Sequence, residues 1–131
     1  MEKTKDLLET SKKQFSSHYL DKMKKSFIKN LKLIDGKELD VNLDVNLNVQ
    51  INEQGSNKEI NYFSTGYKDL IYICMRLSLI DSLFENEKPF IILDDPFINL
   101  DEEKIKNAMQ LINNLSTDYQ IIYFSCHKSR I

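Results

Sequence analysis

Two adjacent carboxylates, Asp94 and Asp95, follow directly on a short apolar run and precede a proline. The run, residues 90–93 (FIIL), is bounded by turn-forming residues, which indicates a buried β-strand. In open α/β sheets, ligands bind at the carboxyl ends of the strands, where these two acids lie. Because buried like charges repel each other without a cation, the pattern predicts a Mg²⁺ or phosphate site.

Other segments carry residue types suited to anion contacts. Ser64 and Gly66 lie at the expected start of a helix, where unpaired N–H groups and the helix dipole attract an anion. Asp101, followed by two glutamates, is a favourable start for another helix, and His127 follows the last apolar run. Each of these residues, taken alone, also has a structural explanation as a cap, a turn residue or a strand end.

The elements that must position these residues can be read from hydrophobic periodicity. Residues 8–34 carry a helical apolar stripe that ends at Asp35-Gly36, and the narrow stripe fits either a coiled-coil seam or a globular packing helix. Residues 39–51 alternate apolar and polar side chains, which predicts one half-buried strand or two. A turn at 53–57 and a returning strand at 58–63 follow.

The second half of the chain has an alternating order of elements. We expect a helix at 66–84 capped by Ser64, a strand at 90–93, a helix starting after Asp101 and a strand at 120–125. A strand, a helix and a strand in succession predict a crossover connection, so the strands at 90–93 and 120–125 should be parallel. The fold class is therefore α/β, with an antiparallel β segment at 39–63.

Composition excludes several classes of protein. The 131 residues suffice for one domain, and a net charge of −2 gives no global argument for nucleic-acid binding, although residues 1–30 hold eight lysines against four acids. No apolar segment approaches the roughly 20 residues that span a bilayer, and no secretion signal is evident, so we expect no membrane partner. Cys74 and Cys126 lie within apolar patterns and suggest no disulfide framework, so we expect a cytoplasmic protein. Zinc is rejected because Cys126 and His127 have no second ligand pair at a suitable spacing.

Four motifs follow one another in the order seen in ABC-type ATPase heads: FSTG at residues 63–66, FIILDDP at 90–96, NLD at 99–101 and the strand-terminal His127. The sequence most resembles the C-terminal lobe of SMC-like ATPases, the coiled-coil proteins of chromosome maintenance and DNA repair. The resemblance covers residues 39–131. It implies that residues 1–35 are the end of a returning coiled-coil arm and that residues 36–131 form the C-terminal lobe of a P-loop NTPase head.

The resemblance also implies a role for each motif residue. Asp94 matches the carboxylate that holds Mg²⁺, and Asp95 matches the catalytic carboxylate that orients or deprotonates the attacking water. Ser64 and Gly66 match the signature segment (residues 63–66), which contacts the γ-phosphate of ATP on the opposing head. The matched D-loop contributes Asn99 and Asp101 (residues 99–101), and His127 matches the switch histidine at the γ-phosphate. Glutamate is usual at the position of Asp95 in ABC ATPases, so hydrolysis is expected to be slow or to need a repositioned water.

The sequence has no P-loop, because none of its three glycines begins a GxxxxGK[ST] motif. We therefore expect a fragment of a longer protein, which binds ATP and Mg²⁺ and hydrolyses ATP only with an N-terminal P-loop lobe. Expected partners are that lobe, a second head in a homodimer, and DNA bound without sequence preference through lysines of residues 3–29. A nuclease subunit is a further candidate partner. Apolar surface at strands 39–51 or 90–93 should drive self-association of the lobe alone.

Two other classes of function remain open from the sequence. One is a metal-dependent phosphoryl-transfer domain, such as a Toprim-like nuclease, with Asp94, Asp95 and Asp101 as metal ligands. This arrangement also requires a glutamate at an earlier strand end, and no glutamate occurs at a suitable position before Ser64. The other is a non-catalytic assembly module whose acids have no catalytic role.

Overall fold

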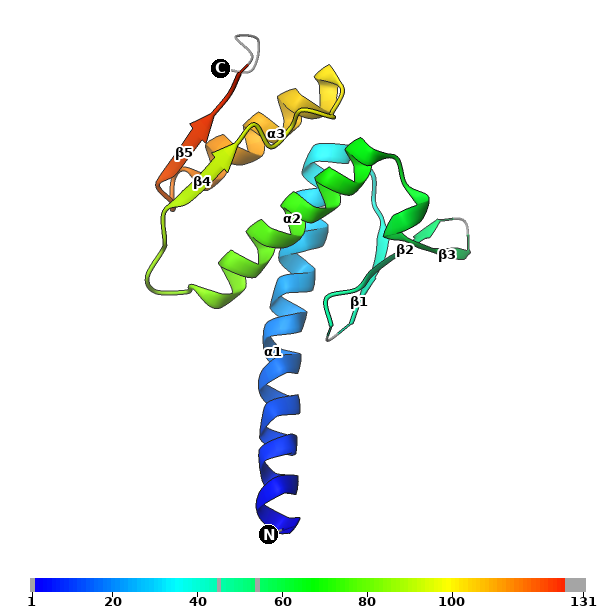
Figure 1. Cartoon of the computed structure of the whole chain (residues 1–131), viewed down its shortest axis with the longest axis vertical. Coiled ribbons are helices and arrows are strands. Elements are labelled where there is room, and N and C mark those ends of the chain that lie inside the picture. The colour runs from blue at the N-terminus through cyan, green and yellow to red at the C-terminus, as the bar shows by residue number, and fades with distance from the viewer. Residues whose placement is uncertain (1, 45, 54, 127–131) are drawn as a thin grey trace.

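A long N-terminal helix, α1 (Glu2–Asp35), supports the rest of the molecule. The computed structural model describes residues 2–44, 46–53 and 55–126. The N-terminal half of α1 extends away from the other elements, whereas its C-terminal half packs against them (Figure 1). Its buried side chains there recur every three or four residues, as the apolar stripe predicted: Met23, Phe27, Leu31 and Ile34. Gly36 ends the helix with a φ of +75°, and its N–H donates to the Lys32 carbonyl oxygen at 2.8 Å.

The alternating segment forms two strands, not one. β1 (Asp40–Leu43) and β2 (Val49–Glu53) pair antiparallel, and β3 (Ser56–Glu59) pairs with β2. The Asp44 carboxylate closes the β1–β2 turn by accepting hydrogen bonds from the backbone N–H groups of Asn46 and Asn48. The apolar side chains of β1 and β2 share one buried face of the sheet: Val41, Leu43, Val49 and Ile51.

The predicted strand at 58–63 was wrong in its position and length. β3 covers Ser56–Glu59, and Ile60–Tyr62 form a 3₁₀ turn, η1, in which Phe63 N–H donates to the Ile60 carbonyl oxygen at 3.1 Å. Glu59 pairs with Gln50, one residue from the start of β2, so almost no partner strand remains for the residues after Glu59. The chain turns at that point and enters the next helix.

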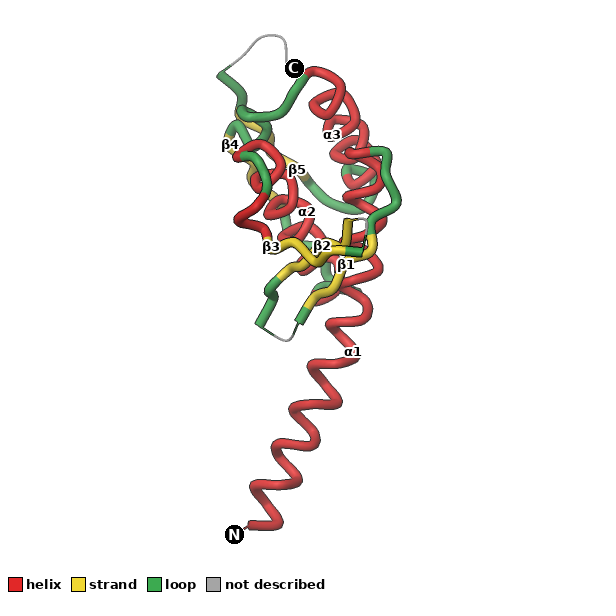
Figure 2. Tube along the Cα trace, turned by 90° about the vertical axis from the view of Figure 1, so that its right-hand side faces the viewer, coloured by secondary structure: helices red, strands yellow, loops and turns green. Residues whose placement is uncertain are grey.

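The second half of the chain follows the predicted order. α2 (Thr65–Leu83) leads to β4 (Ile91–Asp94), α3 (Glu102–Leu115) and β5 (Ile121–Phe124). β4 and β5 are parallel, with Asp94 opposite Phe124. Figures 1 and 2 show α2 lying along the upper part of α1, with the three-stranded sheet on one side and α3, β4 and β5 on the other. One core joins these elements through buried residues of both sheets and all three helices.

The expectation that residues 90–93 form a buried strand holds for only one face of it. Ile91 is 7% exposed, whereas Phe90 and Ile92 are 63% and 56% exposed. The side chains of β5 that share this outer face, Ile122 and Phe124, are 39% and 55% exposed. The described residues therefore cover one face of the β4–β5 pair and leave an apolar face on the other, while the apolar face of the 39–51 strands is buried.

Candidate functional site

The carboxyl ends of β4 and β5 bring the two adjacent acids to one edge of the parallel pair. Asp94 is the last residue of β4 and lies opposite Phe124. Asp95 N–H donates to the Phe124 carbonyl oxygen at 2.9 Å, which extends the pairing by one residue beyond the strand. The chain then turns sharply at Pro96, and Phe97 inserts into the core, where it stacks on Tyr123 with ring centroids 6.2 Å apart.

The two carboxylates have different environments. Asp94 is exposed, and among the described residues its side chain has no hydrogen-bond or ion-pair partner. Asp95 is half-buried and has a φ of +40°, a left-handed conformation that costs an L-residue free energy and that Asp tolerates better than most residues. Strained backbone of this kind is concentrated at functional sites. Asp94 is therefore available to a ligand, and Asp95 follows it in a strained backbone conformation.

The donor set at this edge fits Mg²⁺ held partly by substrate and water. The described residues contain no group of three or more His, Cys, Asp or Glu side chains that could hold a metal ion. Mg²⁺ is commonly bound by one or two carboxylates together with substrate phosphates and waters, so Asp94 with its neighbour suffices. The same finding counts against the alternative in which Asp94, Asp95 and Asp101 form a three-carboxylate metal site.

The signature segment lies at the N-terminus of α2. Ser64 is the N-cap, and its Oγ accepts a hydrogen bond from Tyr67 N–H at 3.3 Å, as the sequence predicted. The phenol of Tyr67 donates to the Asp35 Oδ2 at 3.2 Å, and burial together with the negative charge of Asp35 raises the pKa of this phenol. Tyr67 thus joins the first turn of α2 to the C-terminal end of α1.

Gly66 lies directly against the backbone of the D-loop. A Cβ placed on Gly66 would lie well under 3.0 Å from the Asn99 carbonyl oxygen and 3.1 Å from its carbonyl carbon. The φ of Gly66 is not in the left-handed region, so a glycine is not needed here for its backbone conformation. It is needed because a side chain would collide with Asn99. One turn further along α2, Asp69 Oδ2 accepts a hydrogen bond from Asn99 Nδ2 at 2.6 Å.

Asp101 is the N-cap of α3, as predicted. Its Oδ1 accepts from Lys104 N–H at 2.9 Å, and its Oδ2 forms an ion pair with Lys104 Nζ at 2.9 Å. The hydrogen bond from the Lys104 side chain, reinforced by the backbone donor, lowers the pKa of the Asp101 carboxyl. Asp101 lies at the end of the D-loop and is exposed, although it caps the helix.

His127 lies outside the described residues, so its predicted place at the site stays a prediction. Cys126, the last described residue before it, is exposed and free. The structure therefore brings Gly66 and Asn99 together beside Ser64 at the start of α2, and it places Asp94 and Asp95 separately at the strand ends. Asp101 follows two residues after Asn99.

Sequence reasoning missed the polar contacts that fix α1 to this framework. Asn107 of α3 donates from Nδ2 to the Ile34 carbonyl oxygen at 3.0 Å, close to the Tyr67–Asp35 hydrogen bond. In the sequence, Tyr67 and Asn107 belong to no motif and lie within predicted helices. The one signal that could have revealed these contacts is a polar residue on the inner face of a helix. The two contacts attach the end of α1 to both α2 and α3.

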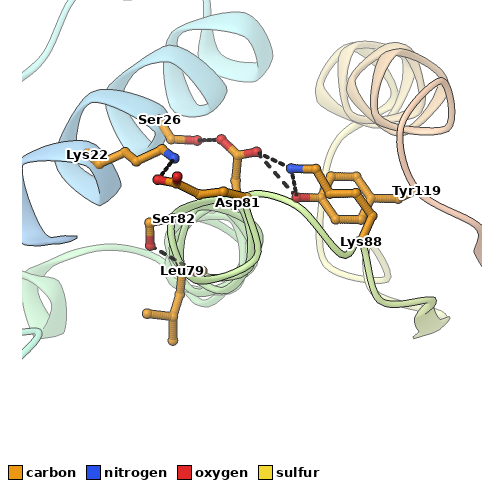
Figure 3. Close-up of polar contacts among 8 residues, drawn as sticks. Lys22, Ser26, Leu79, Asp81, Ser82, Lys88 and Tyr119 are labelled. Carbon is orange, nitrogen blue, oxygen red and sulfur yellow. Dashed lines mark hydrogen bonds and ion pairs between the residues drawn. The ribbon is translucent and has the colours of Figure 1, made fainter.

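A second polar cluster attaches α1 further from its C-terminal end (Figure 3). Asp81 of α2 accepts hydrogen bonds from Ser26 Oγ and Tyr119 OH, both at 3.3 Å, and lies 3.5 Å from Lys88 Nζ. Lys88 also donates to Tyr119 OH at 3.0 Å and lies 4.8 Å from the centre of that ring. Lys88 and Tyr119 precede β4 and β5, so this cluster lies at the amino ends of the strands.

Comparisons with known proteins agree with this geometry. Residues 37–114 match the family model described as SbcC/RAD50-like, Walker B motif. The uncharacterized protein YhaN of Bacillus subtilis strain 168 is 34% identical over 67 residues, a match that covers 50% of this chain and 7% of YhaN. The chain therefore spans a small part of this curated relative.

Solved structures show the same fold at low sequence identity. The Smc head domain with a coiled coil and joint from Pyrococcus yayanosii has a TM-score of 0.75 at 20% identity, covering 95% of this chain and 25% of that one. A chain from a study of ATP-driven dimerization and DNA-stimulated activation of SMC ATPases gives 0.72 at 18% identity, covering 91% and 75%. The SMC head domain from Thermotoga maritima gives 0.64 at 20% identity, covering 83% and 39%.

The family match spans both the signature segment and the strand-end acids, and the structural matches extend over nearly the whole chain. Within the described residues, no helix is long and apolar enough to cross a membrane. The chain belongs to the SbcC/RAD50-like Walker B family and has the fold of the C-terminal part of an SMC-like, ABC-type ATPase head.

Proposed function

We propose that this chain is the C-terminal lobe of an ATPase head that closes on a second head when ATP binds. The observation that carries the proposal is the exposed carboxylate of Asp94 at the end of β4, which has no partner within the described part of the chain, followed by Asp95 in a left-handed backbone conformation. Acids at this edge of a parallel pair suit Mg²⁺–phosphate chemistry. Since the sequence has no P-loop, the lobe is active only beside an N-terminal P-loop lobe.

Each residue of the site has a defined role in this proposal. Asp94 holds Mg²⁺, which when bound offsets the charge of the ATP phosphates. Asp95 orients the attacking water and accepts its proton, and His127 donates a hydrogen bond to the γ-phosphate. The Ser64 hydroxyl and the first-turn N–H groups of α2 bind the γ-phosphate of ATP held by the opposing head. Asn99 and Asp101 contact the opposing head as the D-loop.

The partners of the complete head belong to the same proposal. They are the P-loop lobe, a second head, and DNA bound through its phosphates by lysines of residues 3–29; a nuclease subunit would complete a repair machine. One solved relative, an Smc head, is bound to the C-winged helix domain of ScpA. A partner that docks on the lobe is therefore consistent with the fold. A cytoplasmic location follows from this role.

Substitution of Ser64 by Asp separates the proposed phosphate contact from simple helix capping. Asp caps a helix about as well as Ser, so Ser64→Asp should leave α2 stable. Its negative charge would repel a γ-phosphate at the same place. The lobe is purified with its P-loop lobe, and ATP-dependent dimerisation is measured by light scattering. We expect Ser64→Asp to abolish the ATP-dependent dimer and to leave binding between the two lobes intact.

Two further measurements complete the test. Asp95→Asn should stop ATP hydrolysis while the ATP-bound dimer persists, and the 131-residue chain alone should hydrolyse no ATP. Ser64→Asn is the matched control, because Asn caps a helix about as well as Asp but adds no charge, so its ATP-dependent dimer should persist. Unchanged dimerisation in Ser64→Asp, or robust turnover by the chain alone, would refute the proposed function.

A further inference from the structure

We infer that Asp69 is a positioning residue that holds the D-loop against the signature helix, so that both segments present themselves to the opposing head as one unit. This inference rests on the proposed function and adds Asp69 to its site. The hydrogen bond from Asn99 Nδ2 to Asp69 Oδ2 is 2.6 Å long and joins residues 30 positions apart in the sequence. A donor to a carboxylate makes this a charge-assisted bond, stronger than one between neutral groups.

Asn99 is held at two points by one face of α2. Gly66 and Asp69 are three residues apart, so they lie on the same side of the helix. Gly66 contacts the backbone of Asn99, and Asp69 binds its side chain. The two contacts together fix both the position and the direction of Asn99 relative to Ser64, which lies at the start of the same helix.

The D-loop is also anchored from within. Phe97 is 1% exposed and Leu100 9% exposed, and Leu100 N–H donates to the Phe97 carbonyl oxygen at 3.2 Å. Asn99 itself is exposed between these two anchors. The core therefore fixes the ends of this turn, and Asp69 fixes the polar side chain at its surface. Loss of the Asp69 carboxylate should free Asn99 without unpacking the core.

Hydrogen exchange in the 131-residue chain tests the positioning directly. In Asp69→Ala we expect the Leu100 amide to exchange about tenfold faster, as loss of a charge-assisted hydrogen bond implies, and the Asn99 side-chain amide resonance to move toward that of a free amide. Amides of the β1–β2 pair should be unchanged. Asp69→Asn retains an acceptor oxygen without the charge, so its exchange rate should lie between those of wild type and Asp69→Ala. Lys68→Ala, the neighbouring residue, is the control and should match wild type.

Dimerisation in the head assembled with its P-loop lobe tests the consequence. Asp69→Ala should weaken the ATP-dependent dimer while leaving nucleotide binding to the P-loop unchanged, and Asp69→Asn should weaken the dimer less than Asp69→Ala does. Unchanged exchange in Asp69→Ala, or faster exchange with an unchanged dimer, would overturn the inference. If the wild-type head forms no ATP-dependent dimer, the proposed function fails, and the role of Asp69 in presenting the D-loop fails with it. The exchange result still shows separately whether Asp69 holds Asn99.

Discussion

Replacement of Gly66 by alanine sets two opposed effects against each other. In an ordinary helical position, alanine in place of glycine stabilises a protein by up to about 1 kcal/mol. At Gly66 the added Cβ would meet the Asn99 carbonyl oxygen well under 3.0 Å away, a distance that real Cβ atoms essentially never show. Because the obstacle is backbone and not the end of a flexible side chain, the D-loop itself must move.

The balance of these effects can be estimated from the structure. Forcing extra atoms into a packed site typically costs about 1–3 kcal/mol. The gain in helix propensity is smaller here, because Gly66 is only the second residue of α2 and lies in its first turn. Because this gain offsets only part of the packing cost, we expect Gly66→Ala to lower the free energy of unfolding by about 1–2 kcal/mol.

Urea unfolding followed by circular dichroism measures this change, with the m-value held constant between variants. Thr65→Ala, at the preceding exposed position, is the matched control and should change stability by less than about 0.5 kcal/mol. An increase in stability of Gly66→Ala, as expected for an unobstructed helical glycine, would refute the proposed contact between the signature segment and the D-loop. No change in the Asn99 amide resonance would contradict it independently.

Three other predictions follow from burial and charge. Burial raises the pKa of the Cys74 thiol to about 12, so at neutral pH a thiol reagent should label only the exposed Cys126 in the folded chain and both thiols after unfolding. The apolar outer face of β4 and β5 should make the chain self-associate in sedimentation velocity, and Ile92→Lys should shift it toward monomer; a monomeric wild type at high concentration would count against this. The pKa of Asp101 is lowered in the folded chain, so its ionised carboxylate stabilises the fold above the unfolded pKa, and this stabilisation is lost as the pH falls through the folded pKa. Asp101→Asn should therefore lower the free energy of unfolding at neutral pH and match wild type below about pH 2. An equal difference at both pH values would contradict the assignment.

Local sequence signals predicted most of the elements and the ends at which the site lies. Ser64 and Asp101 were identified as N-caps because their oxygens serve N–H groups only three residues away. The strand-end position of Asp94 followed from the abrupt change from apolar to acidic residues. These features depend on short-range chemistry, which a single sequence contains.

Features that depend on distant segments could not be predicted in the same way. The Asp69–Asn99 hydrogen bond joins two helix-and-loop positions with no shared pattern, and it becomes visible only once α2 and the D-loop are placed together. Apolar and polar residues alternate weakly in residues 58–63, and this pattern was sufficient to predict a strand. The register with β2 ends their pairing at Glu59. The exposure of Ile92 likewise depends on which segments cover the outer face of β4, a property that an apolar run does not specify.

Two of the polar contacts that attach α1 give the helix the mechanics of a cantilever. Ser26 is held by Asp81, and Asp35 is held by Tyr67, nine residues or about 14 Å further along the axis. About 36 Å of helix extends from Ser26 toward the N-terminus, so a sideways force at that end reaches these supports amplified by roughly two and a half to three and a half times. The supports carry it with opposite signs, and both belong to α2. Bending of the arm therefore acts as a torque on α2, and its first turn, which carries Ser64, receives one half of that couple.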